Sequence, residues 1–203
     1  MELIFVRHAL PLRIENAVGA ANPDLDPVGH GQAELMAKYL VEEEIHEVWA
    51  SPMNRAQQTA TPLAALLGLP INTDDRLAEY DRNESTYIPI EELKAANDPR
   101  WQAMVKGEWQ RDMDPTIFQT GVVDAVNDIV QRNSRRRVAV VCHGGVINTY
   151  IAHILGLGNP VGFFYPEYTS LHRVMAASTG ERSVRSLNEI SHLRGSDLRR
   201  PIA

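Results

Sequence analysis

Two short apolar runs, each ending at a histidine, constrain this chain more than any other feature. The first run, Leu3–Arg7, ends at His8, and the second, Arg137–Cys142, ends at His143. Runs of this length and composition are typical of parallel strands that are buried on both faces. Ligands of open α/β sheets bind at the edge formed by the carboxyl ends of the strands. Two imidazoles and the Arg7 guanidinium are therefore predicted to meet at one edge, as an anion site that contains a nucleophile.

Strand-like and helix-like segments alternate along most of the chain. Apolar residues with helical spacing form one stripe at 33–41 and a second at 122–130. This alternation predicts a single domain over residues 1–203, an α/β fold built as a three-layer α/β/α sandwich with a mainly parallel central sheet. Strands are expected at 3–7, 45–50, 137–142, 171–177 and 183–188, and helices at 29–43, 55–67, about 122–130 and 144–155.

Pro62 lies in the middle of the expected helix 55–67. A proline inside a helix removes one backbone hydrogen bond and clashes with the preceding turn. Thr61 as an N-cap, with Pro62 at the first helical position, would avoid both costs. The sequence therefore predicts two helical pieces in succession, the second of which ends at Gly68.

Residues from about 78 to 119 interrupt the alternation with weakly periodic helical pieces and many charges. Long excursions from a compact α/β core are often lids or binding loops, so a helical, lid-like insertion over the active site is predicted. We interpret the aromatic residues of this insertion as a small core of its own rather than as a platform for stacking a ligand. They are Tyr80, Tyr87, Trp101, Trp109 and Phe118.

Composition excludes several functional classes. The net charge of −6 disfavours nucleic acid as a partner, because neutralising a phosphate backbone requires a basic face. No apolar run approaches the length needed to cross a membrane, and no signal peptide is recognisable. Cys142 is the single cysteine, which fits a cytoplasmic location. The histidines outside the two strand ends show no metal-ligand spacing, so neither a metal nor another cofactor is expected.

Three segments at expected strand ends supply residues suited to phosphate chemistry. Arg7 offers a planar fork for phosphate or carboxylate oxygens, and the neutral imidazole of His8 can attack phosphorus. At the second strand end, Gly144 opens a helix whose N-terminal N–H groups attract an anion. At the third, Arg55 lies in the first turn of the helix that follows Ser51. Each feature alone has a structural explanation, but their repetition at strand ends favours a site.

These motifs resemble those of the histidine phosphatase superfamily, which has the phosphoglycerate mutase-like fold. That family carries an Arg-His-Gly opening, a Leu-Thr-x-x-Gly-x-x-Gln-Ala helix opening, a Ser-Pro-x-x-Arg-x-x-Gln-Thr-Ala helix start, a Leu-x-Glu segment and a late His-Gly. The corresponding segments here are Arg7-His8-Ala9, Leu25 to Ala33, Ser51 to Ala60, Leu77-Ala78-Glu79 and His143-Gly144. The resemblance spans nearly the whole chain, and the motifs occur in the family's order.

The resemblance implies a role for each matching residue. His8 would be the nucleophile and would form a phosphohistidine, and Glu79 would protonate the leaving oxygen. Arg7, Arg55 and His143 would hold the phosphoryl oxygens, with His143 counted among the catalytic residues. Two departures lie on the substrate side: Ala9 replaces the family's glycine, and Leu10-Pro11 replaces its Glu-Thr or Glu-Ser.

Two further assignments depend on how the loops are arranged. The loop after His8 is longer than in the family pattern, so Asn16 is matched to the phosphate-contacting asparagine by position alone. Glu84, five residues after Glu79, is the alternative proton donor.

The resemblance implies a metal-independent phosphomonoesterase that acts on a small phosphorylated substrate. A phosphoglycerate-type mutase uses the same nucleophile, and the departures after His8 disfavour it. A non-catalytic module that binds a phosphorylated ligand would be expected to lack His8 or Glu79, and the sequence keeps both. The identity of the substrate and the formation of a homodimer are left open.

Overall fold

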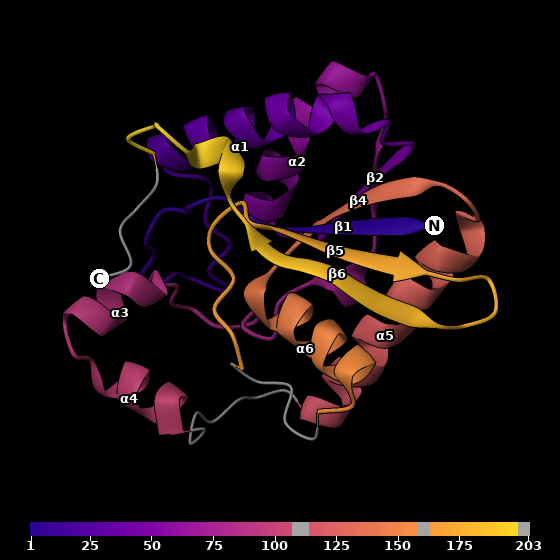
Figure 1. Cartoon of the computed structure of the whole chain (residues 1–203). Helices are drawn as coiled ribbons and strands as arrows, with labels where there is room; N and C mark the ends of the chain where they lie inside the picture. The colour runs from indigo at the N-terminus through magenta and orange to yellow at the C-terminus, as the bar shows by residue number, and fades with distance from the viewer. Residues whose placement is uncertain (107–113, 158–162, 199–203) are drawn as a thin grey trace.

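A six-stranded sheet forms the centre of the computed structural model, which describes residues 1–106, 114–157 and 163–198 (Figure 1). The strand order is β3-β2-β4-β1-β5-β6. The first four of these strands are parallel, and β5 and β6 run antiparallel to their neighbours. The strands are β1 Glu2–Arg7, β2 Glu47–Ala50, β3 Ile71–Thr73, β4 Arg137–Cys142, β5 Leu171–Ala176 and β6 Arg182–Glu189.

Helices cover both faces of the sheet, which confirms the three-layer sandwich. One apolar cluster packs α1 (Pro27–Leu40) and α2 (Asn54–Leu67) against one face of the sheet. A second, larger cluster packs α5 (Pro115–Arg132) and α6 (Gly144–Leu155) against the other face. Figure 1 shows the two helix layers above and below the strands. Short 3-10 helices lie at Val41–Glu43, Asp75–Leu77 and Ser191–Leu193. Among the described residues, no helix is long and apolar enough to cross a membrane.

The strand and helix on either side of His143 begin and end where the sequence predicted, at β4 and α6. The sequence analysis missed β3, a three-residue strand at the edge of the sheet whose residues are only partly buried or exposed. A strand this short shows too little alternation to be detected by its pattern.

The two-piece prediction for residues 55–67 is wrong, because α2 is one continuous helix with Pro62 inside it. The Thr61 hydroxyl donates back to the Gln57 carbonyl oxygen at 2.8 Å instead of capping a new helix. Ala60, Leu63 and Ala64 of this helix are buried, and their burial keeps the helix continuous. The free energy gained by this burial offsets the loss of the backbone hydrogen bond that proline removes. Gly68, with φ +64°, ends the helix as expected.

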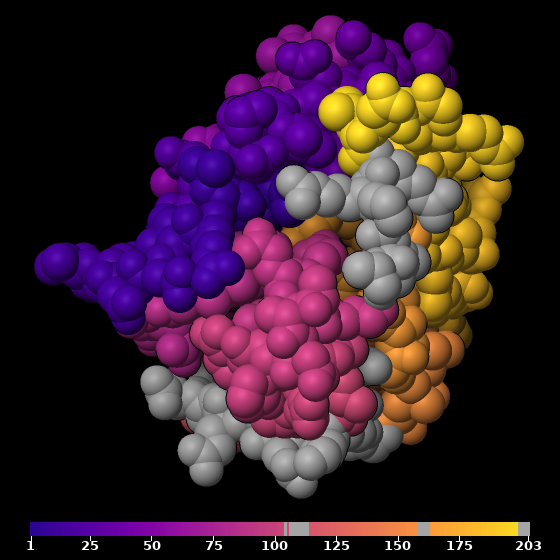
Figure 2. Space-filling model, turned by 90° about the vertical axis from the view of Figure 1, so that its left-hand side faces the viewer, coloured from indigo at the N-terminus to yellow at the C-terminus, as the bar shows by residue number. Residues whose placement is uncertain are grey.

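The segment from residue 78 to α5 contains two short helices, α3 (Ile90–Ala95) and α4 (Pro99–Lys106). It lies at the end of the sheet toward which β1 points (Figure 1). Its first part pairs with the loop after His8: Ile14 and Tyr87 form an antiparallel bridge, and the Ala17 N–H donates to the Ser85 carbonyl oxygen at 2.9 Å. Figure 2 shows these two segments side by side, in indigo and magenta.

Three of the described aromatic residues, Tyr80, Tyr87 and Phe118, do not form a separate core of the insertion, contrary to the interpretation above. Tyr80 and Phe118 meet edge to face at 6.0 Å and join the main apolar cluster on the sheet. Tyr87 instead lies against the guanidinium of Arg55, 4.7 Å from its ring centre. Trp109 lies outside the described residues.

Candidate active site

The register of three neighbouring parallel strands brings the predicted site residues together. Arg7 pairs with Cys142 across β1 and β4, so His8 and His143 leave the sheet side by side. Their ring centres are 5.1 Å apart. Ala50 pairs with Val141 across β2 and β4, so Ser51 emerges beside the same point. Both imidazoles are at least 97% buried, since His8 is 3% and His143 is 0% exposed.

Side chains from both helices above the sheet hold the loop that follows His8. The Ala9 N–H donates to Thr59 Oγ1 at 2.9 Å, and the Leu10 N–H donates to Gln32 Oε1 at 2.9 Å. Gly29 is required here because a Cβ on it would collide with the Leu10 carbonyl. These contacts fix the direction in which the chain leaves β1, and so they fix the position of His8.

One hydrogen bond determines the tautomer of His8. Its Nδ1 lies 2.8 Å from the Ala9 carbonyl oxygen, which can only accept. Nδ1 therefore carries the hydrogen, and Nε2 presents a lone pair. Burial, followed by the positive charges of Arg55 and Arg7, holds the pKa of His8 well below its usual value. The imidazole is consequently neutral at physiological pH, as a nucleophile must be.

His143 is oriented by Ser51. The Nε2 atom of His143 lies 2.7 Å from Ser51 Oγ, and this hydroxyl also accepts the Met53 N–H at 3.3 Å. The hydroxyl can also donate its own hydrogen to Nε2, and with that donation the ring hydrogen of His143 lies on Nδ1. Burial and the charges of Arg55, His8 and Arg7 keep the pKa of His143 well below its usual value.

Arg7 is buried between aromatic rings. Its guanidinium carbon lies 4.0 Å from the ring centre of Tyr168 and 5.1 Å from that of Tyr165. One terminal nitrogen, Nη1, donates to the Pro166 carbonyl oxygen at 2.6 Å. A Cβ added to Gly144 would lie 3.9 Å from Arg7 Nε, so the start of α6 passes beside this arginine.

Arg55 enters from the first turn of α2 and is 1% exposed. Its Nη2 forms an ion pair with Asp81 Oδ1 at 3.0 Å. The Tyr87 ring covers the guanidinium from the side of the insertion. Both partners come from segments that sequence reasoning did not associate with this arginine.

Several buried nitrogen atoms of these side chains have no hydrogen-bond partner among the described residues. They are Arg7 Nε, Arg55 Nε, Arg55 Nη1 and His143 Nδ1. Burying cationic donors without partners is costly, and such groups in native proteins usually have a function. Two arginines and a histidine with free donors beside the lone pair of His8 can bind a tetrahedral anion in contact with a nucleophile.

Glu79 reaches the same region from the turn after Leu77 and is 7% exposed. Its Oε2 accepts the Gly145 N–H at 2.7 Å, and its Oε1 accepts the Tyr80 N–H at 3.1 Å. A side chain at Gly145 is excluded, because its Cβ would lie 2.6 Å from the Tyr80 ring and would collide with Glu79. Burial and the negative charge of Asp81 raise the pKa of Glu79 to about 7. A carboxyl group with this pKa can exchange protons near neutral pH.

Asn16 and Glu84, whose roles depend on how the loops are arranged, lie outside this cluster. Glu84 is exposed, and its carbonyl oxygen accepts the Ala21 N–H. Asn16 is also exposed, adopts a left-handed backbone with φ +53°, and donates its backbone N–H to Thr86 Oγ1 at 3.2 Å. Among the described residues, neither side chain forms a hydrogen bond or an ion pair with the buried cluster, so the role of Asn16 stays a prediction and Glu79 is the better-placed acid.

Sequence reasoning missed a set of supporting residues, namely Asp81, Tyr87, Glu91, Tyr165 and Tyr168. The tyrosines and the carboxylates lie in segments without periodic pattern. Asp81 and the three tyrosines each contact an arginine distant in sequence, and Glu91 contacts the two tyrosines beside Arg7. Ser51 and Thr59 were visible as motif positions, but their partners were not. Local sequence carries no signal for contacts of this kind.

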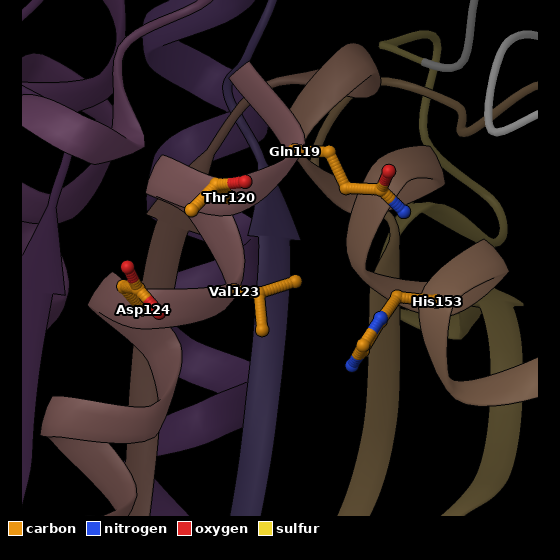
Figure 3. A pocket seen from close by; sticks show the side chains of 5 residues that line it. All are labelled: Gln119, Thr120, Val123, Asp124 and His153. Carbon is orange, nitrogen blue, oxygen red and sulfur yellow. The ribbon is translucent and has the colours of Figure 1, made fainter. Parts of the chain in front are cut away.

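A groove elsewhere on the molecule is separate from this cluster. It lies between α5 and α6, has a volume of about 250 Å³, and is lined by Gln119, Thr120, Val123, Asp124 and His153 (Figure 3). None of the strand-end residues lines it. In the part of the chain that the structure describes, no three His, Cys, Asp or Glu side chains are grouped so that they could hold a metal ion.

Comparisons with known proteins agree with this geometry. The family model of the histidine phosphatase superfamily (branch 1) matches residues 3–190. Phosphoserine phosphatase 1 of Hydrogenobacter thermophilus is 28% identical over 163 residues, with 77% of each chain covered. The glucosyl-3-phosphoglycerate phosphatase of Mycolicibacterium vanbaalenii is 30% identical over 152 residues, covering 68% of this chain and 66% of the relative.

A solved structure shows the same fold. A phosphoserine phosphatase variant from Entamoeba histolytica, in complex with phosphoserine, superposes with a TM-score of 0.73. Sequence identity is 21%, and the match covers 95% of this chain and 98% of that one. At this identity the likeness establishes the fold alone.

Proposed function

The chain belongs to the histidine phosphatase superfamily and is a phosphatase; we propose that it hydrolyses small phosphomonoesters through a phosphohistidine on His8. The observation that carries this proposal is the set of buried, unpartnered donors on Arg7, Arg55 and His143 beside the lone pair of His8. These donors match the three non-bridging oxygens of a phosphoryl group. In this proposal no metal ion takes part.

In the first half-reaction, His8 Nε2 attacks phosphorus and forms a P–N bond. The bond from phosphorus to the ester oxygen breaks, and the leaving oxygen takes the proton of Glu79. The hydrogen on His8 Nδ1 stays hydrogen-bonded to the Ala9 carbonyl oxygen, and this contact stabilises the positive charge that develops on the ring. Arg7, Arg55 and His143 hold the equatorial oxygens while charge builds up on them.

In the second half-reaction, water attacks the phosphohistidine and the P–N bond breaks. Glu79, now a carboxylate, accepts the proton of that water and returns to its starting form. Inorganic phosphate leaves, and the lone pair returns to His8 Nε2. A pKa of about 7 suits Glu79 to both directions of transfer, because neither protonation state is strongly disfavoured at neutral pH.

Magnitudes indicate why several groups are needed. Hydrolysis of phosphate monoesters is accelerated by up to about 10²¹-fold in enzymes, or roughly 28 kcal/mol. One general acid contributes about 10²–10⁴-fold. The covalent intermediate and the ring of buried donors must account for the remainder. This arrangement contains all three components.

Two alternatives use parts of the same site. A phosphoglycerate-type mutase would need the same nucleophile and a pocket that keeps water from the phosphohistidine. A binding module for a phosphorylated ligand would need the donors but neither the His8 lone pair nor a carboxyl group with a raised pKa. The buried Glu79 favours catalysis over binding alone.

The test is a screen of the purified protein against a panel of phosphomonoesters. We put phosphoserine and glucosyl-3-phosphoglycerate first on that panel, because the relatives above are phosphatases of these esters, and then the phosphoglycerates, sugar phosphates and nucleotides. Release of inorganic phosphate supports the hydrolase, whereas isomerisation of a phosphoglycerate without release supports the mutase. Phosphate binding without turnover of any ester would favour the binding module.

The absence of a metal from the proposed mechanism has its own test. Because the guanidinium groups of Arg7 and Arg55 supply positive charge that metal ions provide in other phosphatases, dialysis against EDTA should leave the rate of hydrolysis unchanged. A rate that falls on chelation and recovers with a divalent cation would contradict the proposal.

A further inference from the structure

One carboxylate of the insertion is hydrogen-bonded to both tyrosines that cover Arg7. The Tyr165 hydroxyl donates to Glu91 Oε1 at 3.0 Å, and the Tyr168 hydroxyl donates to Glu91 Oε2 at 3.1 Å. Glu91 lies in the first turn of α3, more than 70 residues from either tyrosine. This contact therefore joins the insertion to the segment that surrounds Arg7.

The segment 165–168 contacts Arg7 through three groups. Tyr165 and Tyr168 present their rings to the guanidinium, and Pro166 between them accepts from Arg7 Nη1. The Tyr168 ring also lies 5.8 Å from that of His8. A small rotation of these rings would change the direction of Arg7 Nε, one of the free donors at the anion site.

We propose that Glu91 is a positioning residue for Arg7, which acts through the hydroxyl groups of Tyr165 and Tyr168. The inference rests on the proposed function, because Arg7 is taken to bind the phosphoryl group. Because the two oxygens of one carboxylate hold both phenol oxygens in place, neither ring can swing away from the guanidinium. The insertion thereby contributes to phosphate binding without touching the phosphate.

The proton positions required by this arrangement agree with the environment. Burial raises the pKa of Tyr165 and holds that of Tyr168 well above its usual value, so both hydroxyls remain donors. The nearby charges come from Arg7 and Glu91, together with the phenol of Tyr87 beside Tyr168. Glu91 can therefore accept both hydrogen bonds while Tyr165 and Tyr168 keep their protons.

The neighbouring residue Glu92 provides a matched control. It lies on the same turn of α3 and pairs with the exposed Arg13 at 2.9 Å rather than with a tyrosine. Glu92→Ala removes a carboxylate of the same size and charge from the same short helix. It should therefore reproduce any general effect on the fold of the insertion, but no effect on Arg7.

The experiment measures the Kd of inorganic phosphate by calorimetry, together with KM and kcat for an aryl phosphate. Glu91→Ala should raise the Kd for phosphate and KM about 10-fold, the size expected when hydrogen bonds that orient a charged group are lost. The Glu92→Ala variant should stay within about 2-fold of the wild type. Glu91→Gln, which keeps one carbonyl acceptor, should recover part of the loss.

A double-mutant cycle tests whether the effect passes through the phenols. In a chain that carries both Tyr165→Phe and Tyr168→Phe, adding Glu91→Ala should weaken phosphate binding less than about 2-fold further. A full effect of Glu91→Ala in that background, or an equal effect of Glu92→Ala, would overturn the proposal.

Measuring phosphate binding as well as hydrolysis makes failure of this inference distinguishable from failure of the proposed function. If the wild type hydrolyses no ester but Glu91→Ala still weakens phosphate binding through the phenols, the function is wrong and the positioning role stands. If the wild type hydrolyses esters and the cycle shows no coupling, the positioning role is wrong and the function stands.

Discussion

The two sides of the candidate site are built in different ways. The floor, which comprises Arg7, His8, Ser51, Arg55 and His143, is attached to the ends of β1, β2 and β4 or to the first turn of α2. Backbone hydrogen bonds between adjacent strands fix the distances across it. The roof, residues 79–92, is not part of the sheet: backbone hydrogen bonds join it to the loop after His8, and individual side-chain contacts such as Asp81 with Arg55 and Glu91 with the tyrosines join it to the rest of the site.

This difference suggests a division of labour. In the proposed mechanism the floor carries the nucleophile and most of the positive charge, which any phosphomonoester requires. In the same proposal the roof carries the acid Glu79, which acts on the leaving group, and the residues that contact the two arginines. Substitutions in the floor should therefore affect all substrates alike, whereas substitutions in the roof should depend on the leaving group, the pH or the positioning of the arginines.

The largest effect is expected in the floor, from loss of the nucleophile. His8→Ala should lower kcat by about 10⁴-fold or more for every phosphomonoester, because no neighbouring group can take over covalent attack. Rapid quenching of the wild type with a radioactive substrate should trap an acid-labile, base-stable label, which this variant should lack. Undiminished labelling of the variant would assign the nucleophile elsewhere.

In the roof, the proton donor should give an effect that depends on the leaving group. Glu79→Gln should slow hydrolysis of an alkyl phosphate by about 10²–10⁴-fold, while an activated aryl phosphate should be affected much less. Steady-state rates on the two substrates provide the comparison. Glu84→Gln, which changes an exposed carboxylate of the same insertion, is the control and should leave both rates unchanged. A leaving-group dependence that appears in Glu84→Gln instead would move the acid role to that residue.

An arginine of the floor should show the opposite pattern. Arg55→Ala should lower the rates for alkyl and aryl phosphates by a similar factor, about 10²–10³-fold, because Arg55 stabilises the transferred phosphoryl group itself. The ratio of the two rates is the decisive quantity. If that ratio changes as strongly as in Glu79→Gln, the division between floor and roof does not hold.

The smallest predicted effect is a shift in pH dependence. Glu79 must be protonated to assist the leaving oxygen, so kcat/KM for alkyl phosphates should fall as the pH rises above about 7. Neither histidine produces this decline, because both have lowered pKa values and are already neutral there.

The Asp81→Asn variant tests whether the decline in kcat/KM comes from ionisation of Glu79. Removing the negative charge of Asp81 stabilises the ionised form of Glu79, so the pKa falls and the decline should begin at lower pH, by up to about one unit. Profiles of kcat/KM between pH 5 and 9 for both proteins measure the shift. If the decline in kcat/KM stays at the same pH or moves to higher pH, Asp81 does not raise the pKa of Glu79.

The strand ends were predictable because each is marked locally. A buried parallel strand needs a continuous apolar run, and Leu3–Arg7 and Arg137–Cys142 provide one in the sequence itself. The helix stripe at Val122, Ala125 and Ile129 was visible for the same reason. Pro62 was misjudged because local propensity was weighed without the apolar face that holds α2 on the sheet.

The sequence by itself determined the chemistry of this protein: an α/β fold with histidines and arginines at strand ends that converge on one edge. It did so because strand periodicity, turn residues and motif order are local properties. Tertiary structure decided the Ser51 contact to His143, the Asp81 pair with Arg55, the Glu91 contact to two tyrosines and the raised pKa of Glu79. These depend on distances and burial between segments far apart in the chain, which are set only when the core packs.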